Sequence, residues 1–195
     1  MKTLIHEDRL QTRIAEMAKE IDLYYRSQEW YKYTTQPVHL IGVMLGAIPF
    51  MEALVQNLSI RTECHWIRMS SYCGTTGKVR SPKSLAEPTK RFRGDTQFNN
   101  HILLVDDILE TGETLNIIQK KYEWPGDDIR TAVLLRKPGK ALSGITADFV
   151  GFDIPDNFVV GYGLDYDGQY RDLPYVAVWS EDESRSSESK TKQCK

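Results

Sequence analysis

The sequence has few cysteines, no excess of basic residues and no long apolar run. Its three cysteines, Cys64, Cys73 and Cys194, form neither a C-x-x-C pair nor an even-numbered set. This pattern is typical of a protein in a reducing, cytosolic compartment. The formal net charge is -2, so no strongly basic surface indicates nucleic acid or an anionic membrane as a partner.

The four histidines, His6, His39, His65 and His101, lack the spacing of a zinc site, and we therefore expect no histidine metal site. No apolar run approaches the roughly 20 residues of a membrane-spanning helix. Polar residues 6–9 interrupt the first apolar residues of the chain, so a secretion signal is not expected.

Length and composition predict one globular domain with a short tail. The 195 residues are 41% hydrophobic and 27% charged, a balance that is common in globular proteins and sufficient for one sizeable core. Residues 180–195 are polar and charged throughout. We therefore expect the folded domain to cover residues 1–179 and the tail to be disordered.

Amphipathic segments alternate with short apolar runs along the chain. Three- and four-residue spacing of apolar residues, or a proline in the first turn, predicts helices at residues 7–26, 49–58 and 115–122. Strands are expected at residues 38–43, 63–69, 101–105, 130–135, 149–154, 157–162 and 175–179. This alternation indicates an α/β fold with a parallel sheet, in which ligands bind at the carboxyl ends of the strands.

Residues 73–98 differ from the rest, because they are rich in Gly, Thr, Ser, Pro, Lys and Arg. A segment of this length between regular elements is either a functional lid or disordered. Its position just before the chemically richest part of the chain favours a lid.

Residues 103–115 (LLVDDILETGETL) combine an apolar strand, two acids and a polar loop that opens a helix. Helix N-termini carry unpaired N–H groups and bind phosphate. Two adjacent carboxylates, Asp106 and Asp107, can accept hydrogen bonds from a ribose diol or hold a divalent cation. The alternative is a solvated turn with Thr114 as the helix cap.

This run resembles the PRPP-binding signature of type I phosphoribosyltransferases: a strand, two acids, two apolar residues and then T-G-x-T. Residues 148–174 (DFVGFDIPDNFVVGYGLDYDGQYRDLP) resemble the C-terminal signature of hypoxanthine-guanine phosphoribosyltransferases almost residue for residue. Residues 70–73 (SSYC) resemble the start of that family's flexible loop, and residues 41–50 (IGVMLGAIPF) its pyrophosphate loop. The resemblance covers about residues 38–179, with all motifs in order.

The resemblance implies a twisted five-stranded parallel sheet with flanking helices and a small hood built from the N- and C-terminal segments. It implies an enzyme that transfers the 5-phosphoribosyl group from PRPP to hypoxanthine, and also to guanine, with Mg²⁺ as cofactor and pyrophosphate as product. The expected partners are therefore PRPP and a 6-oxopurine base, and a homodimer or homotetramer in the cytoplasm is expected.

The resemblance also assigns residues. Those around PRPP and its 5-phosphate are Asp106, Asp107, Glu110, Thr111, Gly112, Glu113 and Thr114, and those at pyrophosphate are Leu45, Gly46 and Arg171. The purine side comprises Lys137, Phe158, Val159 and Asp165. Lys137 would donate to the 6-oxo oxygen and Phe158 would stack on the base. Asp106, Asp107 and Asp165 would hold Mg²⁺, and Ser71 and Tyr72 would belong to the lid.

Two positions depart from the family's pattern. Glu110 stands where the family has an aspartate near purine N7, and we expect Glu110 to be the catalytic residue there, because glutamate has the same chemistry on a longer side chain. Leu45 stands where many relatives carry a lysine or arginine, so backbone donors beside Gly46 would have to hold pyrophosphate.

Two alternatives remain at this point. One is guanine or xanthine as the base in place of hypoxanthine, because a donor to the 6-oxo group fits all three. A non-catalytic RNA-binding regulator of the same fold would favour a basic face, which the net charge of -2 does not favour.

Overall fold

The computed structural model describes residues 1–70, 84–85, 101–122, 128–141 and 144–180. Along the chain the elements are β1 (Lys2–Ile5), α1 (Glu7–Ser27), α2 (Glu29–Tyr33), β2 (Val38–Met44), α3 (Ile48–Asn57), β3 (Thr62–Ser70), β4 (Ser84–Leu85), β5 (His101–Leu109), α4 (Glu113–Tyr122), β6 (Asp128–Arg136), β7 (Phe149–Asp153), β8 (Val159–Val160) and β9 (Val176–Val178).

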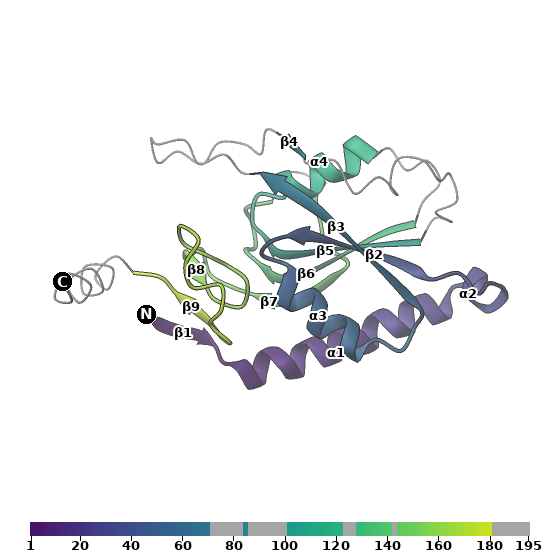
Figure 1. The fold of residues 1–195 in the computed structure, drawn as a ribbon, viewed down its shortest axis with the longest axis horizontal. Helices are drawn as coiled ribbons and strands as arrows, with labels where there is room; N and C mark the ends of the chain where they lie inside the picture. The colour runs from purple at the N-terminus through teal and green to yellow at the C-terminus, as the bar shows by residue number, and fades with distance from the viewer. Residues whose placement is uncertain (71–83, 86–100, 123–127, 142–143, 181–195) are drawn as a thin grey trace, which may run out of the picture.

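The larger sheet has the strand order β4-β3-β2-β5-β6-β7. Its strands β3, β2, β5, β6 and β7 run parallel, and the two-residue β4 pairs antiparallel with β3 at one edge. Helices lie on both sides of the sheet (Figure 1), as parallel sheets require because both of their faces are buried. The predicted α/β fold with five parallel strands is therefore confirmed.

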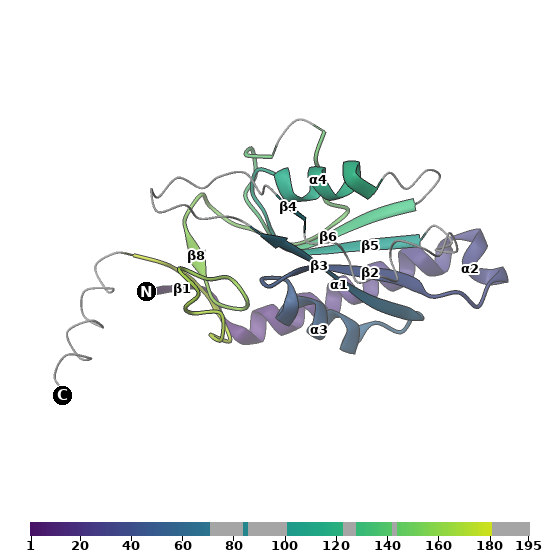
Figure 2. The same cartoon turned by 45° about the horizontal axis from the view of Figure 1, so that its top comes forward.

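Alternate residues of the strands face two apolar cores. Leu40, Leu103 and Leu134 belong to the core beneath α1 and α3. Ile41 and Leu104, one residue further along their strands, belong to the core beneath α4. Figure 2 shows the sheet between these two helical layers. Side chains of a strand alternate between its faces, so continuous apolar runs supply both cores.

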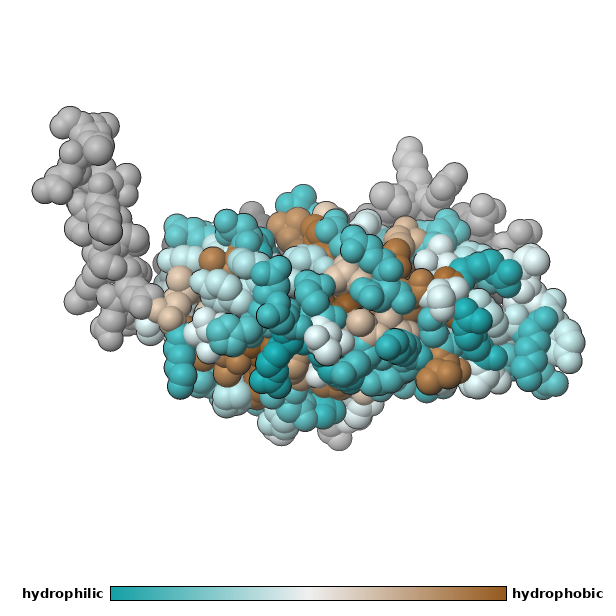
Figure 3. Space-filling view, turned by 90° about the horizontal axis from the view of Figure 1, so that it is seen from below, coloured by the Kyte–Doolittle hydropathy of each residue, from teal (hydrophilic) through white to brown (hydrophobic). Residues whose placement is uncertain are grey.

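The long helix α1 covers one face of the sheet, and its bounds agree with the prediction for residues 7–26. Its buried residues Leu10, Ile14, Met17 and Ile21 are fully enclosed, and burial of each such side chain contributes roughly 1.5–3 kcal/mol. The underside of the molecule, where α1 lies, is mostly hydrophilic with scattered hydrophobic side chains (Figure 3).

The smaller sheet has the order β1-β9-β8, with antiparallel pairing throughout. It joins the first strand of the chain to two late strands, and it lies beyond the carboxyl ends of β2 and β3 (Figure 1). This is the small hood that the resemblance implied. The strand β1 was not predicted, because its four residues take a strand conformation by pairing with β9, which is distant in the sequence.

Other differences are local. β5 continues to Leu109, whereas the prediction ended this strand at residue 105, so Asp106 and Asp107 lie within the strand. The short elements α2 and β4 were not predicted. Most of the predicted loop at residues 73–98 lies outside the described residues, as does the tail from residue 181. Among the helices that the structure describes, none is long and apolar enough to cross a membrane.

Candidate active site

Most of the predicted site residues lie where the central strands end and the hood begins. β2 ends at Met44, directly before Leu45 and Gly46, while β5 and β6 end at Leu109 and Arg136. The backbone N–H of Lys137 donates to the carbonyl of Leu109 at 2.9 Å. Lys137 therefore lies beside the end of β5, next to Glu110. The lid residues Ser71 and Tyr72 lie outside the described residues.

Asp106 and Asp107 form a pair of adjacent carboxylates on β5. Asp106 is buried and Asp107 is partly exposed. Burial raises the pKa of Asp106 well above its ordinary value, and the neighbouring Asp107 raises it further. Burial also raises the pKa of Asp107, although Arg171 acts in the opposite direction. Two adjacent carboxylates repel each other when both are ionised, and a cation removes that repulsion.

The loop after β5 leads directly into α4. Gly112 has φ +74°, and an added Cβ there would lie 2.5 Å from Ile145 Cγ2, so this position requires glycine. The N–H of Glu113 donates to Thr111 Oγ1 at 3.4 Å. Thr114 is the second residue of α4, and the alternative that it caps the helix is therefore wrong.

Gly46 lies between β5 and the hood. An added Cβ on Gly46 would lie 1.6 Å from Asp107 Oδ2, and one on Gly163 would lie 2.0 Å from the carbonyl oxygen of Gly46. The backbones of Gly46 and Gly163 and the carboxylate of Asp107 therefore meet here, without room for a methyl group. The preceding Met44–Leu45 peptide is cis, and the Leu45 side chain is exposed.

Arg171 joins the hood to this packed region. Its Nη2 lies 2.6 Å from Asp165 Oδ1, and its Nη1 donates to the carbonyl of Gly163 at 2.6 Å. The other carboxylate oxygen of Asp165 accepts from the N–H of Gly168 at 2.7 Å. A guanidinium held in this way is oriented for bidentate contact with a phosphate.

Lys137 and Glu110 form the second part of the site. Lys137 is buried, and its Nζ lies 3.2 Å from Glu110 Oε1 and 3.5 Å from Asp156 Oδ1. The exposed Lys140 reaches the same two carboxylates, at 3.3 Å and 2.5 Å. Two lysines and two acids thus neutralise one another beside the end of β6.

Phe158 presents an open aromatic face, because 52% of its surface is exposed. Its ring lies edge-on to those of Tyr166 and Trp179, at centroid distances of 5.8 Å and 5.9 Å. The exposed rings of Phe158 and Tyr166 lie together, and grouped apolar side chains on a surface indicate a binding site, as single ones do not. The adjacent Val159 is buried in β8.

Sequence reasoning missed Lys140, Asp156, Trp179 and Gly163 at this edge. A signal for Lys140 exists in the run Lys137-Pro138-Gly139-Lys140, since a Pro-Gly turn brings its flanking residues together. Asp156 follows β7, which neighbours β6. No local pattern marks Gly163 or Trp179, because their contacts depend on how the hood meets the sheet.

A parallel sheet with carboxylates, a helix N-terminus and an oriented arginine at its carboxyl edge is typical of α/β proteins that bind phosphorylated ligands. Comparison with known proteins narrows this class. The family model described as phosphoribosyl transferase domain matches residues 5–167.

Individual relatives agree with that match. The hypoxanthine-guanine phosphoribosyltransferase of Bacillus subtilis (strain 168) is 36% identical over 182 residues, which cover 91% of this chain and 92% of that protein. A structure of Trypanosoma cruzi hypoxanthine phosphoribosyl transferase has a TM-score of 0.78 and 32% identity, covering 97% of this chain and 96% of that one. A hypoxanthine phosphoribosyltransferase in which an invariant aspartic acid is replaced by glutamic acid has a TM-score of 0.76 and 32% identity, with coverage of 94% and 97%.

This chain belongs to the phosphoribosyltransferase family. The resemblance inferred from the sequence is confirmed, and among curated proteins it points to the hypoxanthine-guanine members.

Proposed function

We propose that this protein transfers the 5-phosphoribosyl group from PRPP to a 6-oxopurine, hypoxanthine or guanine, and releases pyrophosphate. The observation that carries the proposal is the division of one edge of the sheet into two parts. Asp107, Gly46 and Arg171 form a part suited to the phosphorylated sugar, and Lys137 and Phe158 form a part suited to a flat base with a carbonyl group.

PRPP would lie along the carboxyl edge with its 5-phosphate at the start of α4. The N–H groups at that helix terminus, Gly112 and the hydroxyls of Thr111 and Thr114 are suited to the phosphate. Asp106 and Asp107 would accept hydrogen bonds from the ribose hydroxyls. Pyrophosphate would lie between the backbone near Gly46 and the guanidinium of Arg171, with no side-chain cation from Leu45.

The carboxylates suit Mg²⁺, which prefers oxygen ligands. Burial raises the pKa of both Asp106 and Asp107, and a divalent cation would favour their ionised forms. Asp165 offers a further carboxylate on the pyrophosphate side, next to Arg171. When bound, Mg²⁺ would neutralise charge that develops on the leaving pyrophosphate.

The base would stack on Phe158 and accept a hydrogen bond from Lys137 at its 6-oxo oxygen. An ammonium group donates and does not accept, so it suits an oxo group and opposes the amino group of adenine. Asp156 forms ion pairs with Lys137 and Lys140 beside the proposed base position. Val159 would contact the base through its backbone.

In the reaction the bond from C1′ to pyrophosphate breaks and a bond from C1′ to purine N9 forms. Positive character develops on the sugar meanwhile, and the proton at N7 must leave or be shared. We assign Glu110 to that proton. Its carboxylate is paired with Lys137 and Lys140, so it must release them to reach N7.

The non-catalytic RNA-binding alternative has no support in these comparisons, since the curated relatives are enzymes. The assembly is proposed to be a homodimer or homotetramer. The T. cruzi structure comes from work on how the C-terminal region of that protein affects its oligomeric state and activity. The cytoplasmic location stays a prediction from the cysteine pattern.

The test is a steady-state assay of hypoxanthine, guanine, xanthine and adenine, each with PRPP and Mg²⁺. We expect turnover of hypoxanthine and guanine, none of adenine, and loss of turnover in excess EDTA that added Mg²⁺ restores. Full activity in EDTA would contradict the metal assignment, and a preference for xanthine would contradict the assignment of the base.

A further inference from the structure

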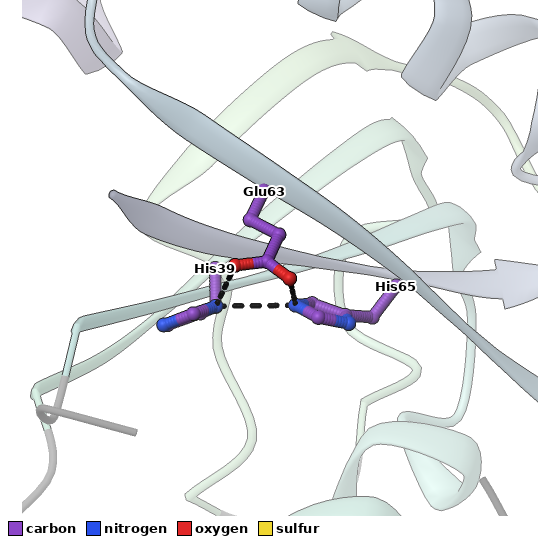
Figure 4. A group of neighbouring side chains, drawn as sticks. All are labelled: His39, Glu63 and His65. Carbon is purple, nitrogen blue, oxygen red and sulfur yellow. Dashed lines mark hydrogen bonds and ion pairs between the residues drawn. The ribbon is translucent and has the colours of Figure 1, made fainter. Parts of the chain in front are cut away.

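Three potential metal ligands meet on the sheet far from the catalytic edge. Nδ1 of His39 lies 3.1 Å from Nε2 of His65, and each of these nitrogens lies 3.9 Å from an oxygen of Glu63. Figure 4 shows the two imidazoles and the carboxylate directing these atoms toward one another. Among the described residues, these three form the group of at least three His, Cys, Asp or Glu side chains in which all ligand atoms lie within 4.8 Å of one another.

The pairing of β2 with β3 produces this arrangement. His39 lies opposite Glu63, and His65 lies opposite Ile41, two residues further along both strands. Residues two apart on a strand share a face, so all three side chains lie on the same face. His39 and His65 are 26 residues apart in the sequence, which is why their spacing gave no signal.

We propose that His39, Glu63 and His65 bind Zn²⁺, at a site separate from the Mg²⁺ site of the catalytic edge. Two imidazole nitrogens and one carboxylate form a known zinc ligand set. Two nitrogens bound to a tetrahedral zinc at 2.0–2.1 Å are about 3.3 Å apart, close to the 3.1 Å between the two histidines. The Glu63 side chain is 48% exposed and has room to move a few tenths of an ångström inward.

The surroundings suit a cation of this type. Both imidazoles are largely buried, with 9% of each side chain exposed, so their positions are constrained by the sheet. A neutral imidazole keeps the lone pair that a metal requires. Bound zinc would link β2 to the edge of the parallel sheet.

The site is distant from the proposed chemistry. His39 is the second residue of β2, and the strand rises about 3.3 Å per residue to Met44 at the catalytic edge. The separation along the strand is therefore about 16 Å. A zinc ion here would act on stability and on the position of β3, and would not contact PRPP or the base.

The experiment is a Zn²⁺ titration of the full chain after removal of metals, with Mg²⁺ in excess to occupy the catalytic carboxylates. Affinity is measured by competition with a chromophoric chelator, and Co²⁺ replaces Zn²⁺ for visible absorption spectroscopy. We expect one saturable site, a Co²⁺ spectrum typical of tetrahedral nitrogen and oxygen ligands, and a higher melting temperature with zinc.

Three variants locate the ion. We expect His39→Gln and His65→Gln to weaken zinc binding at least about tenfold, because each removes a ligand, and Glu63→Gln to weaken it less. His6→Gln, at an exposed histidine, and Cys64→Ser are the matched controls and should bind zinc as the parent does. Glu63 is exposed, so its variant remains informative even if a histidine variant misfolds.

Two results would overturn the proposal. Absence of saturable zinc binding by the parent would mean that the two imidazoles form only a hydrogen bond. Equal zinc binding by the parent and by folded His65→Gln and Glu63→Gln would place the ion elsewhere, for example on the cysteines. Neither result bears on phosphoribosyl transfer, so the proposed function would stand independently.

Discussion

The two parts of the proposed active site differ in how closely their groups are packed. On the pyrophosphate side, Gly163 touches Gly46, Gly46 touches Asp107, and Arg171 is held by Asp165 and the carbonyl of Gly163. On the base side, Phe158 is half exposed, and Glu110 is paired with two lysines. One part is closely packed, whereas the other consists of charged groups that a ligand must separate.

The difference indicates that the two parts are suited to different kinds of ligand. A phosphate group needs donors at fixed positions, and packing of the backbone provides them without further movement. A purine needs a flat surface and one or two hydrogen bonds, and Glu110 neutralises the buried ammonium of Lys137, the proposed donor to the base. A buried charge is costly unless it is paired, so the carboxylates of Glu110 and Asp156 offset the cost of burying the Lys137 ammonium.

The largest effect is expected on the base side, from Glu110→Gln. If Glu110 takes the N7 proton, kcat should fall by about 10²–10⁴-fold while the KM for PRPP stays near that of the parent. Glu110→Asp should recover most of the activity, because it restores the carboxylate. Steady-state kinetics of the three proteins decide the matter. A near-normal kcat in Glu110→Gln would leave the carboxylate with no proton role.

On the pyrophosphate side, Arg171→Ala should reduce kcat/KM for PRPP by about 10²–10³-fold, since it removes an oriented cation at the leaving group. The KM for hypoxanthine should change little. Arg26→Ala, at an exposed arginine near the end of α1, is the control. An Arg171→Ala variant affected mainly in its KM for the base would reverse the assignment of the two sides.

Lys137→Ala should lower kcat/KM for hypoxanthine. The activation free energy should rise by about 2–4 kcal/mol, because a charged donor to the 6-oxo oxygen is lost. Lys140 contacts the same acids but is exposed, so Lys140→Ala is the matched control and should have a smaller effect. Equal losses in the two variants would show that the charge of the cluster matters more than the hydrogen bond.

Gly46→Ala tests the packing of the pyrophosphate side. The new Cβ would lie 1.6 Å from Asp107 Oδ2, so the carboxylate or the loop must shift, with a loss of about 10–10²-fold in kcat/KM for PRPP. Gly144 has φ +86° and no atom within 4 Å of an added Cβ, so Gly144→Ala introduces backbone strain without a steric clash and should leave kcat/KM for PRPP unchanged. Unchanged kinetics in Gly46→Ala would mean that this region is less rigid than its contacts indicate.

The smallest effect concerns stability. The pKa of Asp106 is raised by burial, so folding favours its protonated form. This contribution to stability is complete below the ordinary pKa of 3.8 and is lost as the pH rises through the raised value. Without Mg²⁺ and PRPP, Asp106→Asn should therefore be about 1 kcal/mol more stable than the parent at neutral pH, although inactive.

Urea denaturation at pH 4 and pH 8 measures this difference, which should be larger at pH 8. Asp172→Asn, at an exposed aspartate, is the control. A less stable Asp106→Asn protein at pH 8 would mean that the Asp106 carboxylate stabilises the folded protein.

Much of the fold and of the site follows from local patterns. The stripe of Leu10, Ile14, Met17 and Ile21 predicts α1, and the run LLVDDILETGETL predicts a strand, two acids and a helix N-terminus in that order. Such patterns are readable because helix and strand periodicity and the conformation of glycine act over a few residues.

Tertiary structure decided the rest. β1 depends on β9, and Gly163 and Asp107 meet at Gly46 through packing of the hood against the sheet. The strand register alone brings His39 to Glu63 and His65. These contacts join segments from distant parts of the sequence, and no short-range preference encodes which strand lies beside which. Many residues of this edge could therefore be singled out one by one from the sequence, whereas Gly163, Asp156 and the contacts among these residues became visible only once the sheet had formed.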